Sequence, residues 1–393
     1  MLTKKARSKA KPRTTSRPQS PVVTRHVSHL QRLLLFVRAG GRCEFDGCND
    51  YLLEDGLTLT EGNFSQVAHI VGFREEGPRG KDGKRPRNIN QIENLMLLCA
   101  KHHKLIDDHP QDYTRLGLEK YKKSHEDRVR HVTSLGANRK TAVLVFKAPI
   151  GGHTVAVPFD RVVEATAPRY PMSRDPLTID LTQMPTTTRK HLQTACDAIV
   201  PRVTPFFSPE GEAMKAGHVS VFAIGPIPLL IFLGRQLTSK VPIDVYQRHR
   251  DTESWTWKTD GPSVTYVVSD MKAGAKDKVA LVLSLSGKIQ VDTLPQEVRD
   301  SYTIYELSLG TGTPNPTFLR TPADLEGFRL AYQELLGRVL QQHGALQTVD
   351  LFPAVPAPVA VLCGRELLPK VHPKLRIFDY DKDAGGFTLT LIV

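Results

Sequence analysis

Residues 97–110 read LLCAKHHKLIDDHP, a stretch that places one cysteine, three histidines and two aspartates directly behind an apolar run. Within it Cys99 and His102 are separated by two residues, and Cys43 and Cys48 form a second short-spaced pair in RCEFDGC. Two such pairs are what a closed tetrahedral zinc site requires, because each pair sits on a knuckle of the chain and the metal clamps the knuckles together. We therefore predict a structural Zn²⁺ held by Cys43, Cys48, Cys99 and His102. The alternative is a set of buried reduced cysteines and surface histidines.

The residues around the two pairs predict a small domain over residues 25–140. A domain so rich in loops has little core without its metal. The expected strands are SQVAHIVG and NLMLLC, and the second runs into a helix that begins near His102. An amphipathic helix, HLQRLLLFVRA, stops at Gly40-Gly41, and a charged helix over residues 115–134 closes the domain. Between the strands, GPRGKDGKRPRN is expected to form a flexible basic loop.

Three polar residues outside the zinc pairs are candidates for chemistry. His69 lies on the first expected strand, Asn94 stands at the head of the second, and His103 is adjacent to His102 but must point another way. A histidine, an asparagine and a further histidine in this order can assemble one hydrolytic site, with a general base, an orienting amide and a metal ligand. The spacing leaves open which of His102 and His103 serves zinc and which serves the catalytic cation. Asp107 and His109 either approach that cation or cap and solvate the helix.

At these residues the sequence resembles the HNH endonuclease family, which has an α+β fold of the ββα-metal type. The match covers roughly residues 28–134 and is carried by His69 in AHI, Asn94 in ENLMLLC and the second histidine of CAKHH. The resemblance implies that His69 deprotonates a water, that Asn94 holds its imidazole, and that His103 ligates a catalytic divalent cation such as Mg²⁺. One departure is Ala68, which stands where many HNH enzymes carry an aspartate or histidine as a further metal ligand.

The charge of the chain is concentrated at its N-terminal end. Residues 1–140 carry 27 Lys and Arg against 16 Asp and Glu, whereas residues 141–393 carry 26 against 25. Such asymmetry is expected when one part of a protein contacts DNA or RNA and the other part does something different. The alternative is a solvated tail, because residues 1–24 form a basic stretch that is expected to be disordered.

The bulk composition is that of an ordinary globular protein. At 393 residues and 40% hydrophobic composition, the chain is long enough for two or three domains. No apolar run approaches the roughly 20 residues that a membrane span needs, and the N-terminus lacks the apolar segment of a secretory signal. We therefore expect a cytoplasmic protein without a membrane partner.

Beyond a linker expected over residues 141–164, the sequence of residues 165–393 predicts an α/β domain with a largely parallel sheet covered by helices. The expected strands are 220–225, 243–247, 279–286, 303–309, 346–355 and 387–393, and the expected helices are 187–200, 226–237 and 324–344. Two segments, SVFAIGPIPLLIFLGRQL and VDLFPAVPAPVAVLCGREL, are weakly similar to each other, and we call them the echo segments. Two Rossmann-like halves that arose by duplication would produce this similarity, although any two strand-to-helix units have a similar sequence pattern.

The two echo segments and VYQRHRDTESWTWK resemble the SAVED domain, which consists of two fused Rossmann-like halves related to CRISPR-associated (CARF) sensor domains. An HNH domain followed by SAVED is the layout of effector nucleases in CBASS, the bacterial cyclic-oligonucleotide antiphage signalling system. The resemblance implies an endonuclease that is silent until a cyclic di- or trinucleotide occupies SAVED. Ligand-driven homo-oligomerisation, from dimer to tetramer, would then align the HNH domains for non-specific cleavage of double-stranded DNA and abortive infection.

A ligand of a doubly wound sheet is expected outside the carboxyl ends of the strands, where phosphates meet N–H groups at helix starts. Arginines there can pair with phosphates, and Trp255, Trp257 and Phe352 can stack on bases, although one tryptophan is expected to be a core anchor. The candidate ligand-binding residues are Gly225, Pro226, Gln247, Arg248, Arg250, Trp257, Lys258, Gly310, Thr311, Phe352 and Pro353.

Two other function classes fit parts of the sequence. One is a constitutive or modification-dependent HNH restriction endonuclease whose C-terminal half recognises DNA; the other is a zinc-stabilised DNA-binding regulator. The near-neutral second half weighs against the first, because a DNA-reading domain usually brings a basic face. The set of His69, Asn94 and His103 weighs against the second, because a regulator needs zinc ligands but no general base.

Overall fold

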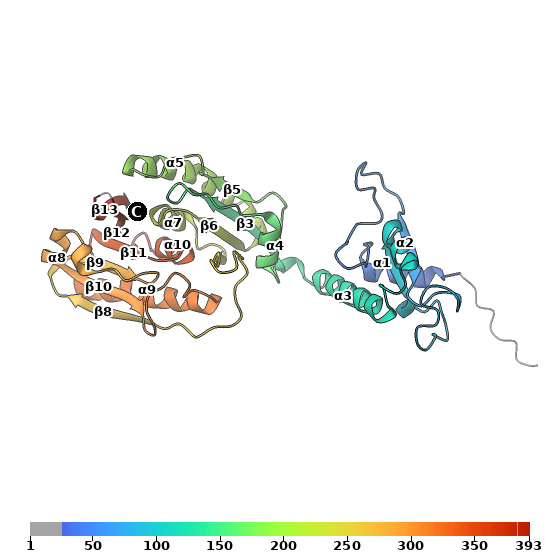
Figure 1. Ribbon diagram of the computed structural model, residues 1–393. Coiled ribbons are helices and arrows are strands. Elements are labelled where there is room, and N and C mark those ends of the chain that lie inside the picture. The colour runs from blue at the N-terminus through green and yellow to red at the C-terminus, as the bar shows by residue number, and fades with distance from the viewer. Residues whose placement is uncertain (1–25, 383) are drawn as a thin grey trace, which may run out of the picture. The chain divides into compact units, whose positions relative to one another are not determined.

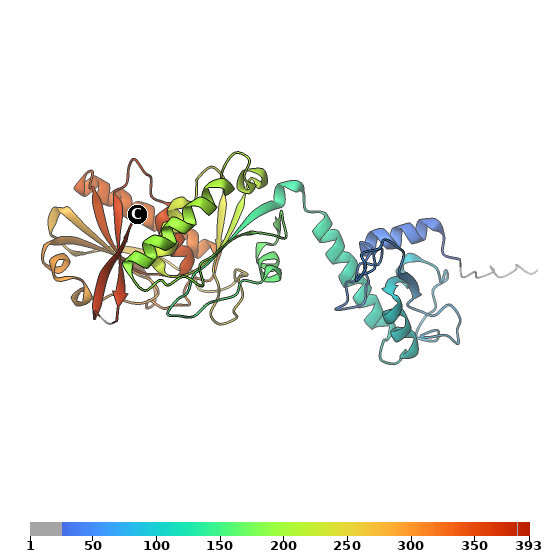
Figure 2. The same cartoon turned by 90° about the horizontal axis from the view of Figure 1, so that it is seen from above.

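The computed structural model describes residues 26–382 and 384–393, which form two compact units that divide between Leu135 and Gly136 (Figure 1, Figure 2). The basic tail expected over residues 1–24 lies outside the described residues. The division falls earlier than expected, because the stretch 141–164 is not a linker: it holds most of β3 (Lys140–Lys147) and α4 (Phe159–Thr166). Strand β3 is buried on both faces, so its apolar run lacks the period-2 alternation by which a strand is recognised.

The described part of the first unit contains three α-helices, two strands and a 3₁₀ turn, and the expected helices and strands are confirmed. Helix α1 begins with a capping box of Ser28 and Gln31 and ends at Gly40, whose φ of 62° closes the helix. The apolar core joins α1 to the strand pair and to the two later helices. The elements are α1 (His29–Ala39), β1 (Ser65–His69), a 3₁₀ turn (Ile92–Asn94), β2 (Leu95–Cys99), α2 (Ala100–Asp108) and α3 (Arg115–Thr133).

The first sheet of the second unit is parallel throughout. Its order is β4-β3-β6-β7, and β5 pairs with the later part of β3. Alternate residues of β3 face opposite layers: Leu144 and Phe146 join the large central cluster, whereas Val143 and Val145 pack under α4. The other strands and the helices of this half are β4 (Tyr170–Pro171), β5 (Leu177–Asp180), α5 (Arg189–Phe206), α6 (Glu212–Ala216), β6 (Val219–Ile224), α7 (Ile227–Gln236) and β7 (Ile243–Tyr246), after a 3₁₀ turn (Ala137–Arg139).

The second sheet has a parallel centre and antiparallel edges, in the order β13-β12-β11-β9-β10-β8. The expected α/β character of this region is therefore confirmed, in two sheets. The elements are β8 (Tyr266–Lys272), β9 (Ala275–Ser284), a 3₁₀ turn (Val291–Thr293), α8 (Gln296–Ser301), β10 (Tyr302–Leu309), α9 (Pro322–His343), β11 (Thr348–Ala354), α10 (Ala357–Arg365), β12 (Lys374–Asp381) and β13 (Gly386–Ile392). Among the described residues, no helix combines the length and the apolar character that a bilayer span requires.

Helices α7 and α10 lie side by side between the two sheets (Figure 1). They come from the two segments that echo each other in the sequence, and they approach at their glycines. A Cβ on Gly234 would lie 1.9 Å from the carbonyl oxygen of Val361, and a Cβ on Gly364 would lie 1.9 Å from that of Ile231. The two contacts are reciprocal: the glycine of each helix faces a carbonyl group of the other helix, and that carbonyl lies three residues before the other helix's own glycine.

Candidate metal centre and hydrolytic site

The four expected zinc ligands come together in the first unit. One ligand atom from each of Cys43, Cys48, Cys99 and His102 lies within 4.8 Å of all the others. Nδ1 of His102 is 3.1 Å from Sγ of Cys99 and 3.7 Å from Sγ of Cys43. A tetrahedral Zn²⁺, with Zn–S bonds of about 2.3 Å and a Zn–N bond of about 2.0 Å, needs donors at such separations. The donor set is therefore compatible with zinc.

The local sequence explains how each half of this cluster is shaped. The knuckle between Cys43 and Cys48 turns at Gly47, whose φ is 78°, and the Cys48 amide donates to the Phe45 carbonyl at 3.0 Å. The Phe45 ring stacks on the His102 imidazole with 4.1 Å between ring centroids. The second half combines the last residue of β2 with the first turn of α2.

Burial keeps the ligand groups of the cluster uncharged. Burial raises the pKa of the Cys43 thiol well above its ordinary value, and burial also raises the pKa of Cys48. Burial lowers the pKa of His102, which keeps its imidazole neutral and able to ligate. Thiols of this kind become thiolates when a divalent cation supplies the compensating charge.

The strand pair separates the zinc cluster from the candidate base. In the antiparallel register Ser65 lies opposite Cys99, and His69 lies opposite Leu95. Four residues of strand, about 13 Å at roughly 3.3 Å per residue, therefore separate His69 from the zinc end. Helix α2 starts at the zinc end and contacts both strands.

His69 is held by a residue that the sequence analysis did not single out. Its Nε2 lies 2.9 Å from Oδ1 of Asn90, and the amide Nδ2 of Asn90 donates to the carbonyl oxygen of His26 at 3.2 Å. Because an amide oxygen only accepts, Nε2 of His69 carries the proton and Nδ1 keeps its lone pair. A neutral imidazole in this state can take a proton from water. The segment NINQIEN contains three asparagines, and no pattern in it marks Asn90.

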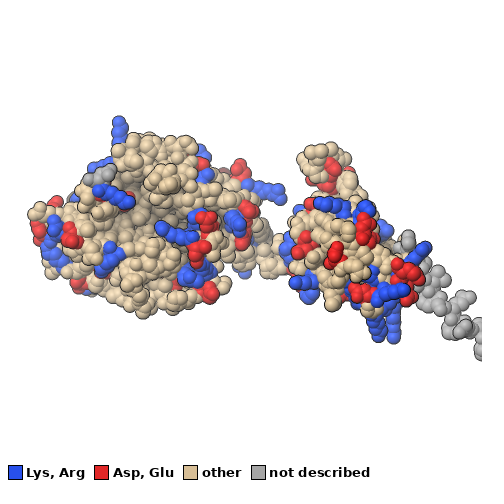
Figure 3. All heavy atoms as spheres, viewed as in Figure 1, with Lys and Arg blue, Asp and Glu red and all other residues tan. Residues whose placement is uncertain are grey.

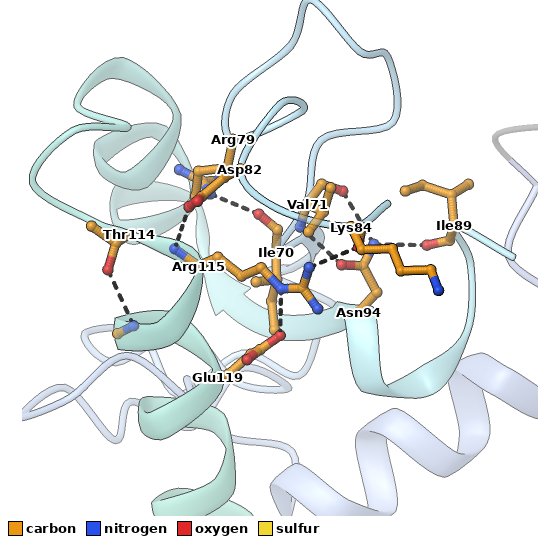
Figure 4. Close-up of polar contacts among 11 residues, drawn as sticks. Ile70, Val71, Arg79, Asp82, Lys84, Ile89, Asn94, Thr114, Arg115 and Glu119 are labelled. Carbon is orange, nitrogen blue, oxygen red and sulfur yellow. Dashed lines mark hydrogen bonds and ion pairs between the residues drawn. The ribbon is translucent and has the colours of Figure 1, made fainter. Parts of the chain in front are cut away.

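Asn94 acts on the backbone and not on the imidazole. Its side chain is 4% exposed, accepts from the Val71 amide at 2.8 Å, and donates to the carbonyls of Val71 and Ile89 at 3.1 and 2.8 Å (Figure 4). These bonds fix the chain just after β1 and just before β2. The Asn94 side chain thus contacts the backbone on either side of the strand pair, and the side chain that contacts the His69 ring is that of Asn90.

The two adjacent histidines of α2 have different surroundings. His102 belongs to the cysteine cluster, whereas Nε2 of His103 lies 3.9 Å from Oδ2 of Asp107. Both side chains of this second pair are partly exposed, so a cation and a phosphate can reach them. His109 follows as the C-terminal cap of α2, and Ala68 is buried in the core.

The second unit contains a cavity of about 510 Å³ along the edge strand β7. The end of α4, the start of α9 and the end of α10 form its other walls. Four arginines and one tryptophan line it: Arg139, Arg169, Arg329, Arg365 and Trp257. Arg329 is paired with Glu326 at 2.7 Å, whereas the buried Nε of Arg365 has no hydrogen-bond partner among the described residues.

Comparison with known proteins assigns both units. Residues 43–110 match the family model of the HNH endonuclease, and residues 201–393 match that of SAVED, the SMODS-associated and fused to various effectors sensor domain. Residues 43–110 are thus similar to an HNH endonuclease domain, and residues 201–393 are similar to a SAVED domain. The HNH match contains the Cys43, Cys48, Cys99 and His102 cluster together with His69, Asn94 and His103. The SAVED match begins within α5, and the preceding strands belong to the same compact unit.

Solved structures similar to the chain include receptors that contain a SAVED/CARF domain. One is Cap4 of Acinetobacter baumannii with the cyclic trinucleotide 2′3′3′-cAAA, at 13% identity and a TM-score of 0.42, covering 78% of this chain and 64% of that chain. Another is Cap4 of Moraxella osloensis, at 9% identity and a TM-score of 0.37, covering 79% and 71%. The chain thus spans 64% of the length of the A. baumannii receptor. No curated protein sequence matches it.

The expected ligand-binding residues of the SAVED domain do not form one site. Trp257 lines the large cavity, whereas three others line a separate space of about 10 Å³ beside His249: Gln247, Arg250 and Lys258. Arg248 pairs with Glu253 at 3.0 Å, and Lys258 pairs with Asp251. The remaining candidates outside the core follow two strands: Gly225 and Pro226 after β6, and Gly310 and Thr311 after β10.

Two of the aromatic candidates are core residues. Phe352 is 0% exposed and stacks on Phe378 with 4.7 Å between centroids, so the expectation that it stacks on a base is wrong. Pro353 beside it is also buried, because helices and strands cover both faces of β11. Trp255 is 2% exposed and packs on Phe222, which confirms that one of the two tryptophans anchors the core. The four arginines of the cavity come from distant segments, so no local pattern could have grouped them.

Proposed function

We propose that this chain is a metal-dependent endonuclease of the cytoplasm that cuts double-stranded DNA without sequence preference, and that a cyclic oligonucleotide bound to SAVED activates it by driving homo-oligomerisation. The biological setting is CBASS antiphage defence by abortive infection. The observation that carries the nuclease part is the His69 imidazole, whose Nε2 is engaged by Asn90 and whose Nδ1 is left to accept a proton. On this proposal the HNH domain is a ββα-metal unit, and SAVED consists of two Rossmann-like halves.

The residues of the HNH domain divide the hydrolysis among them. Nδ1 of His69 takes a proton from the attacking water, and the Nε2–H bond to Asn90 stabilises the imidazolium that forms. Asn94 keeps the backbone at the end of β1 in place during this transfer. His103 would hold the catalytic divalent cation, which supplies charge stabilisation to the phosphate and the leaving 3′ oxygen. The cysteine cluster would hold Zn²⁺ as a structural ion, separated from His69 by four residues of strand.

The arginine-lined cavity is our candidate for the activator site. Its volume of about 510 Å³ lies within the roughly 300–1,000 Å³ typical of small-molecule pockets. Guanidinium groups recognise phosphates through paired hydrogen bonds, and Trp257 offers a face for a base. Arg365 lines this cavity, and its buried Nε has no hydrogen-bond partner among the described residues, so its guanidinium is not fully engaged by protein acceptors. A cyclic di- or trinucleotide combines these two chemistries.

The deciding experiment incubates the purified full chain with plasmid DNA and Mg²⁺, with and without a panel of cyclic di- and trinucleotides. We expect degradation only when one of the nucleotides is present, together with a larger oligomer by light scattering. Degradation without any nucleotide would favour the constitutive restriction endonuclease. Binding of DNA without cleavage under every condition would favour the regulator.

A variant pair tests the activator site. Arg169→Ala should raise the nucleotide concentration for half-maximal cleavage by roughly 10–100-fold, the effect of losing one charge-assisted hydrogen bond of about 1.5–3 kcal/mol. Arg174→Ala, an exposed arginine outside the cavity lining, is the control and should behave as wild type. An equal change in the half-maximal nucleotide concentration for both variants would show that the cavity is not the activator site.

A further inference from the structure

The loop GFREEGPRG, residues 72–80, folds so tightly that the side chain of Arg79 is buried inside the protein. A Cβ on Gly72 would lie 2.5 Å from the Pro78 carbonyl oxygen, and one on Gly80 would lie 2.3 Å from that of Glu75. Glycine is therefore required at both positions. Arg79 between them has a φ of 56°, a conformation that a non-glycine residue adopts at a cost of about 1 kcal/mol or more. Its side-chain contacts must offset that cost.

The Arg79 side chain is 1% exposed and joins two elements. Its Nε donates to the Ile70 carbonyl at 2.7 Å, just after β1 (Figure 4). Its Nη1 donates to the Ile106 carbonyl at 2.5 Å, and its Nη2 contacts Oδ1 of Asp107 at 3.1 Å, both near the end of α2. One guanidinium therefore fixes the end of β1 against the end of α2.

These two elements carry the two reactive groups of the HNH site. Ile70 directly follows His69, and α2 carries His103 one turn before Asp107. The carboxylate of Asp107 lies between the two groups: Oδ1 contacts Arg79 at 3.1 Å, and Oδ2 lies 3.9 Å from Nε2 of His103, close to the ring but beyond hydrogen-bond distance. A histidine that ligates a metal commonly directs its other ring nitrogen to a carboxylate, which fixes the ring orientation.

We propose that Arg79 and Asp107 are positioning residues of the nuclease site, and this inference rests on the proposed nuclease function. Arg79 fixes the distance between the base His69 and the metal ligand His103. Asp107, itself oriented by Arg79, sets the direction of the His103 imidazole. Only arginine can fill the first role, because the single ammonium group of lysine cannot reach three acceptors in a fixed planar fork.

The test compares Arg79→Lys and Asp107→Asn with wild type in the full, zinc-loaded chain. The matched control is Asp108→Asn, on the same helix, where an exposed carboxylate pairs with Lys104 at 2.5 Å. Zinc content, Mn²⁺ affinity by calorimetry, and kcat and KM for plasmid DNA with activating nucleotide are measured for each. We expect Arg79→Lys to lower kcat about 100-fold with KM little changed, since misplacement by about 1 Å has this effect. Asp107→Asn should weaken Mn²⁺ binding roughly 10–100-fold.

The control should retain wild-type values, and all variants should retain zinc. Wild-type Mn²⁺ affinity and wild-type kcat in both Arg79→Lys and Asp107→Asn would overturn the inference while leaving the nuclease function intact. If Arg79→Lys loses zinc, the Mn²⁺ affinity and kcat of Asp107→Asn test the inference, because this variant leaves the two carbonyl contacts of Arg79 in place. If wild type cuts no DNA, the proposed function fails, and the Mn²⁺ affinities still test the positioning of His103.

Discussion

His69 can accept a proton through only one of its two ring nitrogens, and Asn90 decides which. The amide of Asn90 is itself held by the His26 carbonyl, so its oxygen faces Nε2 of His69 at 2.9 Å. This arrangement fixes the tautomer with the free lone pair on Nδ1. A single asparagine in a loop thus determines from which side of the ring a water can be deprotonated.

Replacement of His69 tests this role. His69→Ala should abolish DNA cleavage, a loss of at least about 100-fold, because general-base catalysis typically contributes 10²–10⁴ in rate. Nucleotide binding, oligomer size and zinc content should remain as in wild type. The control is His131→Ala, an exposed histidine on α3. A His69→Ala protein that degrades plasmid at the wild-type rate would show that another group is the base.

Loss of one zinc ligand should act on stability. Cys99→Ser removes a sulfur from the cluster of Cys43, Cys48 and His102 and should release the metal and unfold the HNH unit, whose core is small. Zinc analysis and circular dichroism of the full chain measure the effect. Cys196→Ser, a buried cysteine of α5 outside the cluster, serves as the control and should keep one zinc per chain. A folded, active Cys99→Ser protein without zinc would contradict the structural role.

At the scale of elements, two helices at the centre of the SAVED domain pack backbone against backbone. Helices α7 and α10 cross where Gly234 faces Val361 and Gly364 faces Ile231. Backbones can approach this closely only at glycine, since any Cβ would overlap a carbonyl oxygen. The reciprocal contact explains why both echo segments carry a glycine at the same position near the end of the helix: the backbone of the other helix packs against each glycine.

A methyl group at this crossing should destabilise the domain. Gly234→Ala should lower the free energy of unfolding by about 1–3 kcal/mol, the usual cost of overpacking a close contact. Gly337→Ala on α9, where an added Cβ meets nothing within 4 Å, should instead raise it by up to about 1 kcal/mol through helix propensity. Urea unfolding followed by tryptophan fluorescence reports this unit, because Trp255 and Trp257 are the only tryptophans in the sequence. Equal effects of the two variants would refute the tight crossing.

At the scale of the whole molecule, the two units differ in charge as well as in fold. The excess of Lys and Arg lies before residue 141, whereas the later residues are almost neutral. On the face drawn in Figure 3, the SAVED unit shows charges of both signs scattered among uncharged areas. Eight of the eleven excess positive charges before residue 141 lie in residues 1–25. A polyanion is therefore expected to bind through the N-terminal part of the chain, residues 1–140, and the SAVED unit to bind a small anion in its cavity.

This division predicts where salt acts. Binding of the full chain to DNA should weaken on the order of 10³-fold between 50 and 200 mM salt if about six phosphates are contacted. Lys81→Gln with Lys84→Gln, in the exposed loop of the HNH unit, should reduce the slope of log affinity against log salt by about one for each lysine. The control pair, Lys276→Gln with Lys370→Gln, is exposed on the SAVED unit and should leave the slope unchanged. Fluorescence anisotropy of labelled DNA measures both, and a larger change in the control pair would contradict the assignment.

Features that depend on residues close together in the chain could be predicted from the sequence. The spacing of Cys43 to Cys48 and of Cys99 to His102 predicted the metal cluster, because a knuckle is closed by residues only a few positions apart. Apolar periodicity and glycine stops predicted α1, β1, β2 and α3 for the same reason. Which side chains from distant segments meet could be seen only in the folded molecule. It paired His69 with Asn90 and left Asn94 on the backbone, brought Arg79 to the ends of β1 and α2, buried Phe352, and gathered the cavity arginines. These outcomes depend on the direction in which each side chain packs, and that direction is fixed only when the elements are assembled.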